Sequence, residues 1–195
     1  MKFSIKKILA AVTFVLGLAG TAQANIVTNG DFETGDTSGW LTTASGSNGV
    51  TTGFNGYSLG GVNGNFALFG GCVRRLCGNA QTLATIAGGT YTFEFDYGSD
   101  GGTPNEFIAF WNGTIVFHTI NDLTDTRPGF IHETFNVTAT SASTTIEFQM
   151  RNDPSWQALD NVSVIASQTV PEPTSLALVG LGLIGLAGSR RRKAA

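Results

Sequence analysis

The chain has 195 residues, with 11 Lys and Arg, 14 Asp and Glu, and a formal net charge of −3. The charges are unevenly distributed, because residues 25–169 contain four arginines, no lysine and 13 acidic residues. A region this acidic repels phosphate backbones, which argues against nucleic acid as a partner. Its length of about 145 residues suits one domain with a sizeable core.

The first 24 residues have the three parts of a secretory signal peptide. Three lysines among the first seven residues precede an apolar stretch, and the letters AQA at positions 22–24 follow it as an A-x-A cleavage site. We therefore predict that the protein is exported and that its mature chain begins at Asn25.

Both cysteines lie in the sequence GGCVRRLCGN, where Cys72 and Cys77 enclose four residues. Export places them in an oxidising compartment, which favours a structural disulfide. A metal or redox pair is the alternative, but two thiols without nearby histidines leave zinc short of ligands. We expect a disulfide that closes a short loop and stabilises the fold modestly.

Alternation of apolar and polar residues dominates the rest of this region and predicts β-strands. In TYTFEFDY (residues 90–97) the aromatic residues share one face, and TTIEFQMR (residues 144–151) alternates in the same way. The segment EFIAFWNGTIVFH predicts two strands joined by a tight turn at Asn112-Gly113. With further strands in IHETFNVTA and LDNVSVIA, the pattern predicts an all-β sandwich.

The C-terminal segment, residues 170–195, combines a Pro-Glu-Pro motif, an apolar run and a basic terminus. The run of roughly 13 residues would span about 20 Å as a helix, against about 30 Å of hydrocarbon in a bilayer. Together with the signal peptide, this order of features resembles the PEP-CTERM sorting signal of Gram-negative bacteria. The residues that carry the resemblance are Val170, Pro171, Glu172, Pro173, Arg190, Arg191 and Arg192.

The PEP-CTERM resemblance implies a short hydrophobic C-terminal helix that holds the protein transiently at the inner membrane. It also implies processing near the motif by exosortase, a membrane protease. Because the Pro-Glu-Pro segment cannot continue a strand or helix, we expect it to be accessible to that protease, and the mature chain to end near Val170.

A second resemblance covers most of the body. The opening NIVTNGDFETGDTSGW, the central GGTYTFEFDY and the closing WQALDNVSV are similar to galactose-binding-like jelly rolls, the fold of many carbohydrate-binding modules. This implies a jelly-roll β-sandwich with adjacent first and last strands. It also implies one structural Ca²⁺ where those strands meet, with Glu33 and Asp160 as candidate ligands beside backbone carbonyls. The alternative is that Asp31, Glu33 and Asp160 only cap turns.

Aromatic rings are the main candidates for ligand binding, because the C–H faces of a sugar stack on flat rings. Trp156, Trp111 and Tyr57 fall at or near predicted loops or strand ends. Trp156 is the first choice, since it follows an Asp-Pro turn. Burial in the core is the alternative for each, and it is at least as strong for Trp111. Trp40 is expected in the core.

The sequence offers no clustered catalytic constellation. His118 and His132 lack partners at metal-ligand spacing, and no G-x-S-x-G motif occurs. The remaining enzymatic option is Glu94 with Glu147 on facing strands as a glycosidase pair. Strands carry such carboxylates routinely as solvated residues, so we expect no enzyme.

These inferences divide the chain into a signal peptide (residues 1–24), a β-sandwich (residues 25–169) and a sorting segment (residues 170–195). The predicted function is that of a non-catalytic protein of the cell envelope, cell surface or extracellular matrix, which associates with exopolysaccharide. Its expected partners are exosortase, polysaccharide and, transiently, the inner membrane. The alternatives are a structural matrix protein without a discrete ligand, or a glycan-active enzyme.

Overall fold

The computed structural model describes residues 23–44, 48–52, 64–153 and 155–167. The predicted sorting segment, Tyr57 and nearly all of the predicted signal peptide lie outside these residues. All regular secondary structure in the described residues is β-strand. In this part of the chain, no helix is long and apolar enough to cross a membrane.

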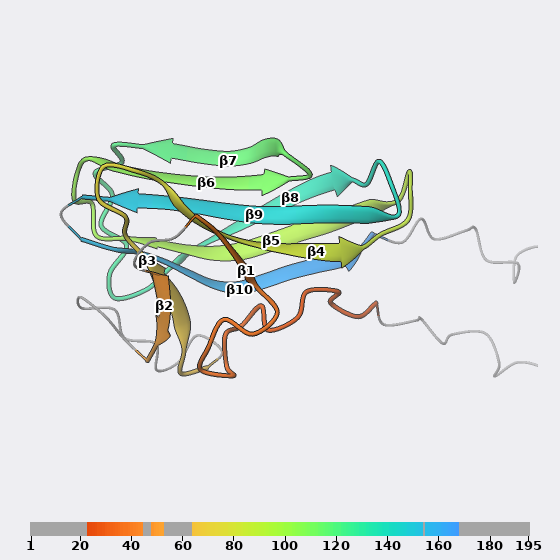
Figure 1. The fold of residues 1–195 in the computed structure, drawn as a ribbon, viewed down its shortest axis with the longest axis horizontal. Helices are drawn as coiled ribbons and strands as arrows, with labels where there is room; N and C mark the ends of the chain where they lie inside the picture. The colour runs from red at the N-terminus through yellow and green to blue at the C-terminus, as the bar shows by residue number, and fades with distance from the viewer. Residues whose placement is uncertain (1–22, 45–47, 53–63, 154, 168–195) are drawn as a thin grey trace, which may run out of the picture. The chain divides into compact units, whose positions relative to one another are not determined.

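Within the described residues, ten strands form two antiparallel sheets of five strands each, stacked as two layers (Figure 1). In spatial order, the first sheet consists of β1 (Leu41–Ala44), β4 (Cys77–Ala84), β9 (Ser143–Asn152), β6 (Asn105–Trp111) and β7 (Thr114–Ile120). The second consists of β2 (Asn48–Thr51), β3 (Ala67–Gly70), β10 (Gln157–Ala166), β5 (Thr90–Ser99) and β8 (Ile131–Thr138). This is the two-sheet sandwich that the alternating sequence predicted.

The core lies between the sheets and is rich in aromatic rings. Along β5 the inward-facing side chains are almost completely buried, and they are Tyr91, Phe93, Phe95 and Tyr97. Phe95 packs edge-on against Phe148 of β9 in the opposite sheet, with ring centroids 5.1 Å apart. Alternation places every second residue of a strand on one face, so the predicted faces of β5 and β9 are confirmed.

The turn between β6 and β7 also follows the sequence prediction. Asn112 and Gly113 both have positive φ, of 48° and 78°. Two consecutive residues with positive φ form the type I′ turn that matches the twist of a hairpin, and Asn-Gly is its preferred sequence.

The start of the described chain lies along β10, beyond the first residue of β3. Ile26 N donates to Val164 O at 3.0 Å, and Val162 N donates to Gly30 O at 2.8 Å. The first and last segments of the body are therefore adjacent, as the jelly-roll resemblance implied. Between Asp160 and Ser163 the pairing of β10 with β5 is interrupted by a bulge, where Asn161 has a φ of 49°.

Candidate functional site

Four loops converge at one end of the sandwich, which we call the loop end (left in Figure 1). Strand register brings them together, because Met150 near the end of β9 pairs with the first residue of β4, and Asn105 at the start of β6 pairs with Asn152. Loops on a rigid scaffold are a common location for binding residues. The described residues of the four loops are 71–76, 100–104, 121–130, and 153 with 155–156.

Trp156 lies in the β9–β10 loop at this end and is half-buried. Its ring packs against a small apolar cluster that is separate from the main core. That cluster consists of Ala67, Phe69 and Ala158, with Phe130 against it. Because Leu68 and Leu159 of the same strands point into the main core, alternation places the small cluster on the outer face of the second sheet. Trp156 therefore packs against the outer face of the second sheet, at the loop end.

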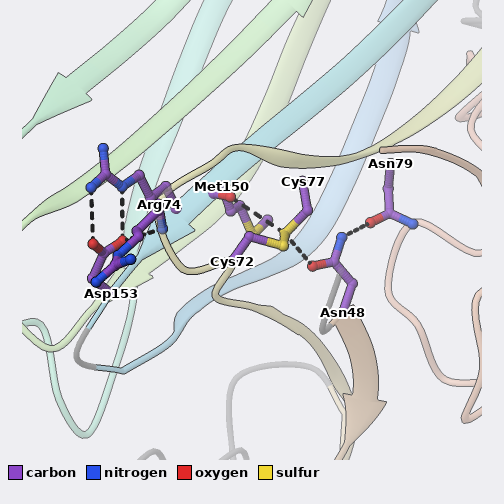
Figure 2. The surroundings of a disulfide bond; sticks show 8 residues. Asn48, Cys72, Arg74, Cys77, Asn79, Met150 and Asp153 are labelled. Atoms are coloured by element: carbon purple, nitrogen blue, oxygen red, sulfur yellow. Dashed lines mark hydrogen bonds and ion pairs between the residues drawn. A yellow bond between two sulfur atoms is a disulfide. The ribbon is translucent and has the colours of Figure 1, made fainter. Parts of the chain in front are cut away.

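A disulfide between Cys72 and Cys77 closes the β3–β4 loop (Figure 2), which confirms the expected bond. The Cα atoms are 5.7 Å apart, within the range that a disulfide requires. Both cysteines are buried, whereas Val73 in the loop between them is 58% exposed. The bond therefore anchors an exposed loop to the core.

The disulfide loop is also attached to the loop that carries Trp156 (Figure 2). Arg74 N donates to Asp153 Oδ1 at 2.8 Å. Arg151 donates to the same carboxylate from Nε and Nη2, at 2.8 and 2.9 Å. These hydrogen bonds lower the pKa of Asp153 to about 2, so the carboxylate is ionised at neutral pH.

The two loops also pack backbone to backbone. A Cβ added to Gly71 would lie 2.3 Å from the carbonyl oxygen of Ser155 and 3.2 Å from Cα of Trp156. Only glycine allows so close an approach. The β3–β4 and β9–β10 loops therefore form one unit at the loop end.

The other predicted aromatic residues do not join Trp156. Trp111 is only 5% exposed, and its Nε1 donates to Thr138 O at 2.9 Å. Trp111 is therefore a core residue and not the sugar-binding residue that was considered. Its ring lies against Tyr91 and Phe93 and is almost completely buried. Trp40 is in the core, as expected.

The candidate cation ligands lie where the first segment meets β10. Asp160 is 5% exposed, and its Oδ1 accepts a hydrogen bond from Asn161 N at 2.7 Å. Burial raises the pKa of Asp160 to about 7, and the negative charges of Asp96, Glu33 and Asp31 act in the same direction. Glu33, the other candidate ligand, is thus one of the charges that act on Asp160.

Two of these carboxylates accept hydrogen bonds from backbone amides, as the capping alternative expects. Glu33 Oε1 accepts hydrogen bonds from Asn65 N and Phe66 N, at 2.6 and 2.8 Å, just before β3 begins. Asp31 Oδ1 accepts a hydrogen bond from Glu33 N at 3.4 Å. Glu33 therefore ties the first segment to β3, a long-range contact that local sequence patterns do not reveal.

The negative charge around Asp160 suits a cation, but the side chains there supply few ligands for one. Among the described residues, no three Asp, Glu, His or Cys side chains are arranged so that they could hold a metal ion. Ca²⁺ takes six to eight oxygens, and backbone carbonyls can supply part of them. Asp160 and Glu33 would thus need carbonyl groups beside them, while the surplus negative charge around Asp160 favours a cation.

A polar groove with a volume of about 400 Å³ lies on the outer face of the second sheet, beside the first segment. Its lining has no Phe, Tyr, Trp, Arg or Lys, and consists of Asn25, Val27, Asn29, Gly30, Asp31, Glu94, Asp96, His132, Asn161, Val162 and Ser163. At its centre Asp96 contacts His132 Nδ1 at 2.7 Å and Asn161 Nδ2 at 2.6 Å. The sequence analysis did not group these residues, although alternation alone places Glu94 and Asp96 on one face.

The proposed glycosidase pair does not form. Glu94 belongs to β5 of the second sheet, and Glu147 belongs to β9 of the first. Their strand neighbours Phe93 and Phe148 are buried between the sheets, so alternation directs the two carboxylates to opposite outer faces. His118 lies on β7, where its Nε2 contacts Glu106 at 3.0 Å, away from both.

A comparison with known protein families matches one short segment near the C-terminus. Residues 169–192 match the model of the PEP-CTERM protein-sorting motif. This motif implies export, processing by exosortase and sorting to the cell surface. No curated protein matches the sequence.

Solved structures share the sandwich fold of the body. One is the carbohydrate-binding module TmCBM61 in complex with β-1,4-galactotriose, with a TM-score of 0.56 and 13% identity over 74% of this chain and 99% of that chain. Another is the Stig cyclase Fisc from Fischerella sp. TAU, with a TM-score of 0.56 and 22% identity over 75% and 98% of the two chains. A third is tailspike protein 4 of bacteriophage CBA120, with a TM-score of 0.54 and 13% identity, over 73% and 21%. These similarities establish the fold, which binding modules and enzymes share.

Proposed function

We propose that the β-sandwich is a non-catalytic module that binds polysaccharide at the loop end, and that its sorting motif delivers it to the cell surface or extracellular matrix. The observation that carries this proposal is the position of Trp156. Of the three tryptophans, Trp40 and Trp111 are buried in the core, whereas Trp156 is half-buried in a loop. A supported, partly exposed ring is the feature on which a sugar stacks.

The similarity to a module that was solved with a galactose oligosaccharide supports this assignment at the level of fold. The separation of Glu94 and Glu147 on opposite faces supports a binding role over glycoside hydrolysis, which needs two carboxylates within about 5–10 Å. The competing function is that of a structural matrix protein without a discrete ligand. A measurement of polysaccharide binding distinguishes the two functions.

We further propose that one structural Ca²⁺ joins the first segment to β10, with Asp160 and Glu33 among its ligands. Its support is the buried carboxylate of Asp160, whose pKa is raised to about 7 by burial and by neighbouring negative charges. When bound, the ion would supply the positive charge that this cluster lacks. Asp160 and Glu33 would then hold residues 31–33 against the bulge of β10.

Replacing Trp156 with alanine is expected to weaken binding to the producing organism's own exopolysaccharide by about tenfold or more, because a central aromatic anchor carries a large share of binding energy. The measurement is a pull-down of purified mature protein with that polymer and with β-1,4-galactan. The Trp156→Phe variant keeps a ring on the apolar cluster and should retain more of the binding.

The matched control is Ile86→Ala, which removes a side chain that is 74% exposed at the opposite end of the sandwich. It should bind as the unchanged protein does. If Trp156→Ala binds equally well while its near-ultraviolet circular dichroism is native, the loop end is not the site. If neither polymer binds the unchanged protein, the structural matrix function is correct.

A further inference from the structure

The positive charge of the body is confined to the loop end. All four arginines of residues 25–169 lie there, with Arg74 and Arg75 in the disulfide loop, Arg127 in the β7–β8 loop and Arg151 near the end of β9. Apart from these, the body carries only acidic formal charges. A polyanion that approaches the body therefore meets arginine side chains at this end alone.

Two of the four arginines are neutralised by neighbouring carboxylates. Arg127 binds Asp125 from Nε and Nη2, at 2.8 and 2.6 Å, and Arg151 binds Asp153 in the same bidentate manner. The other two, Arg74 and Arg75, are exposed. Within the described residues, their guanidinium groups make no hydrogen bond, although the charge of Arg74 also acts on Asp153.

The loop that carries the exposed pair is attached to the loop that carries Trp156. The disulfide closes the loop that carries Arg74 and Arg75. The bond from Arg74 N to Asp153 Oδ1 fixes the loop to the segment preceding Trp156, and Gly71 packs against the backbone of Trp156. The backbone segments that carry the two arginines and Trp156 thus belong to one unit, although the two guanidinium groups themselves remain exposed.

We propose that the ligand of the loop end is an acidic polysaccharide, whose carboxylate groups bind Arg74 and Arg75 while a sugar ring stacks on Trp156. This inference rests on the proposed function and adds the chemical class of the ligand. Guanidinium groups suit the assignment, because they bind carboxylates through two parallel hydrogen bonds. The loop end as a whole has no net formal charge, because Asp100, Asp122, Asp125 and Asp153 balance its four arginines, so complementarity to a carboxylate is confined to the exposed pair.

The test measures binding of the mature protein to polygalacturonate, an acidic polymer, and to neutral β-1,4-galactan, each at low and high salt. The double variant Arg74→Gln, Arg75→Gln is expected to bind polygalacturonate about tenfold more weakly or worse, while any binding to galactan stays unchanged. Binding of the unchanged protein to polygalacturonate should weaken as salt rises.

The matched control is the double variant Ile86→Glu, Thr114→Glu, which makes the same change in net charge at exposed positions of the opposite end. It should bind polygalacturonate within about twofold of the unchanged protein. An equal loss in this control would show that net charge alone governs binding, and would overturn the inference. Equal binding to phosphatidylglycerol vesicles would likewise overturn it, since the patch would then serve any anionic surface.

Two further results separate this inference from the proposed function. If the protein binds galactan and not polygalacturonate, the acidic ligand is wrong and polysaccharide binding stands. If it binds neither these polymers nor the organism's own exopolysaccharide, both fail.

Discussion

Replacing Gly30 with alanine is expected to lower the free energy of unfolding by about 3 kcal/mol or more. The new Cβ would lie 2.0 Å from Val162 O, a backbone atom of β10 that cannot rotate away. To relieve this clash, residues 25–33 must move off β10, which breaks the hydrogen bond from Val162 N to Gly30 O. The same movement uncovers Phe32, which is completely buried.

Gly49→Ala is the matched control for this substitution. An added Cβ at Gly49 meets no atom within 4 Å, and the residue is exposed in β2. Its effect should stay within about 0.5 kcal/mol. Urea unfolding of the mature protein measures both variants, and a Gly30→Ala variant as stable as Gly49→Ala would contradict the tight junction between the first segment and β10.

In EDTA, the free energy of unfolding is expected to fall between about pH 4 and pH 7, by up to about 1.4 kcal/mol per pH unit. Burial raises the pKa of Asp160 from its ordinary 3.8 to about 7, assisted by the charges of Asp96, Glu33 and Asp31. Between these values the folded chain holds a proton that the unfolded chain has released. Asp160 therefore favours the folded state at low pH, and this contribution is lost as pH rises through 7.

Ca²⁺ is expected to oppose this loss, because it binds the ionised carboxylates of the folded chain. At pH 7.5, a concentration about 100 times Kd would stabilise the protein by about 2.7 kcal/mol. The Asp160→Asn variant should lose both the pH slope and the Ca²⁺ response. Glu147→Gln, on the outer face of the first sheet, should keep both.

Unfolding curves at pH 5 and 7.5, in EDTA and in Ca²⁺, measure these four expectations together. If Ca²⁺ stabilises the Asp160→Asn variant as much as the unchanged protein, the proposed cation ligands are wrong. If the unchanged protein shows no pH slope in EDTA, Asp160 does not retain its proton in the folded state.

The strands of the body were predictable because their determinants are local. Alternation in residues 90–97 and 144–151 follows from the two-residue period of a strand, and the Asn112-Gly113 turn follows from the positive φ that both residues adopt. The disulfide was predictable from cellular compartment and spacing. None of these inferences needed knowledge of which strands pair.

The site was less predictable, since it depends on contacts between distant segments. The Asp-Pro turn before Trp156 favoured this residue over Trp111, but local sequence does not fix how deeply either ring is buried, because both lie near strand ends. Arg74 and Arg75 could not be assigned to the site from sequence, because only strand register places the disulfide loop beside the loop that carries Trp156. The groove around Asp96 likewise needs β5, β8 and β10 to lie side by side.

The most direct test of polysaccharide binding at the loop end follows the three indole N–H signals of the mature protein by NMR. The probe is a titration with oligosaccharides from the producing organism's exopolysaccharide. The indoles of Trp40 and Trp111 donate to the carbonyl oxygens of Asn29 and Thr138 in the core, so they serve as internal controls. We expect the Trp156 signal to shift while these two stay in place; a titration that saturates with the Trp156 signal unmoved would contradict the account.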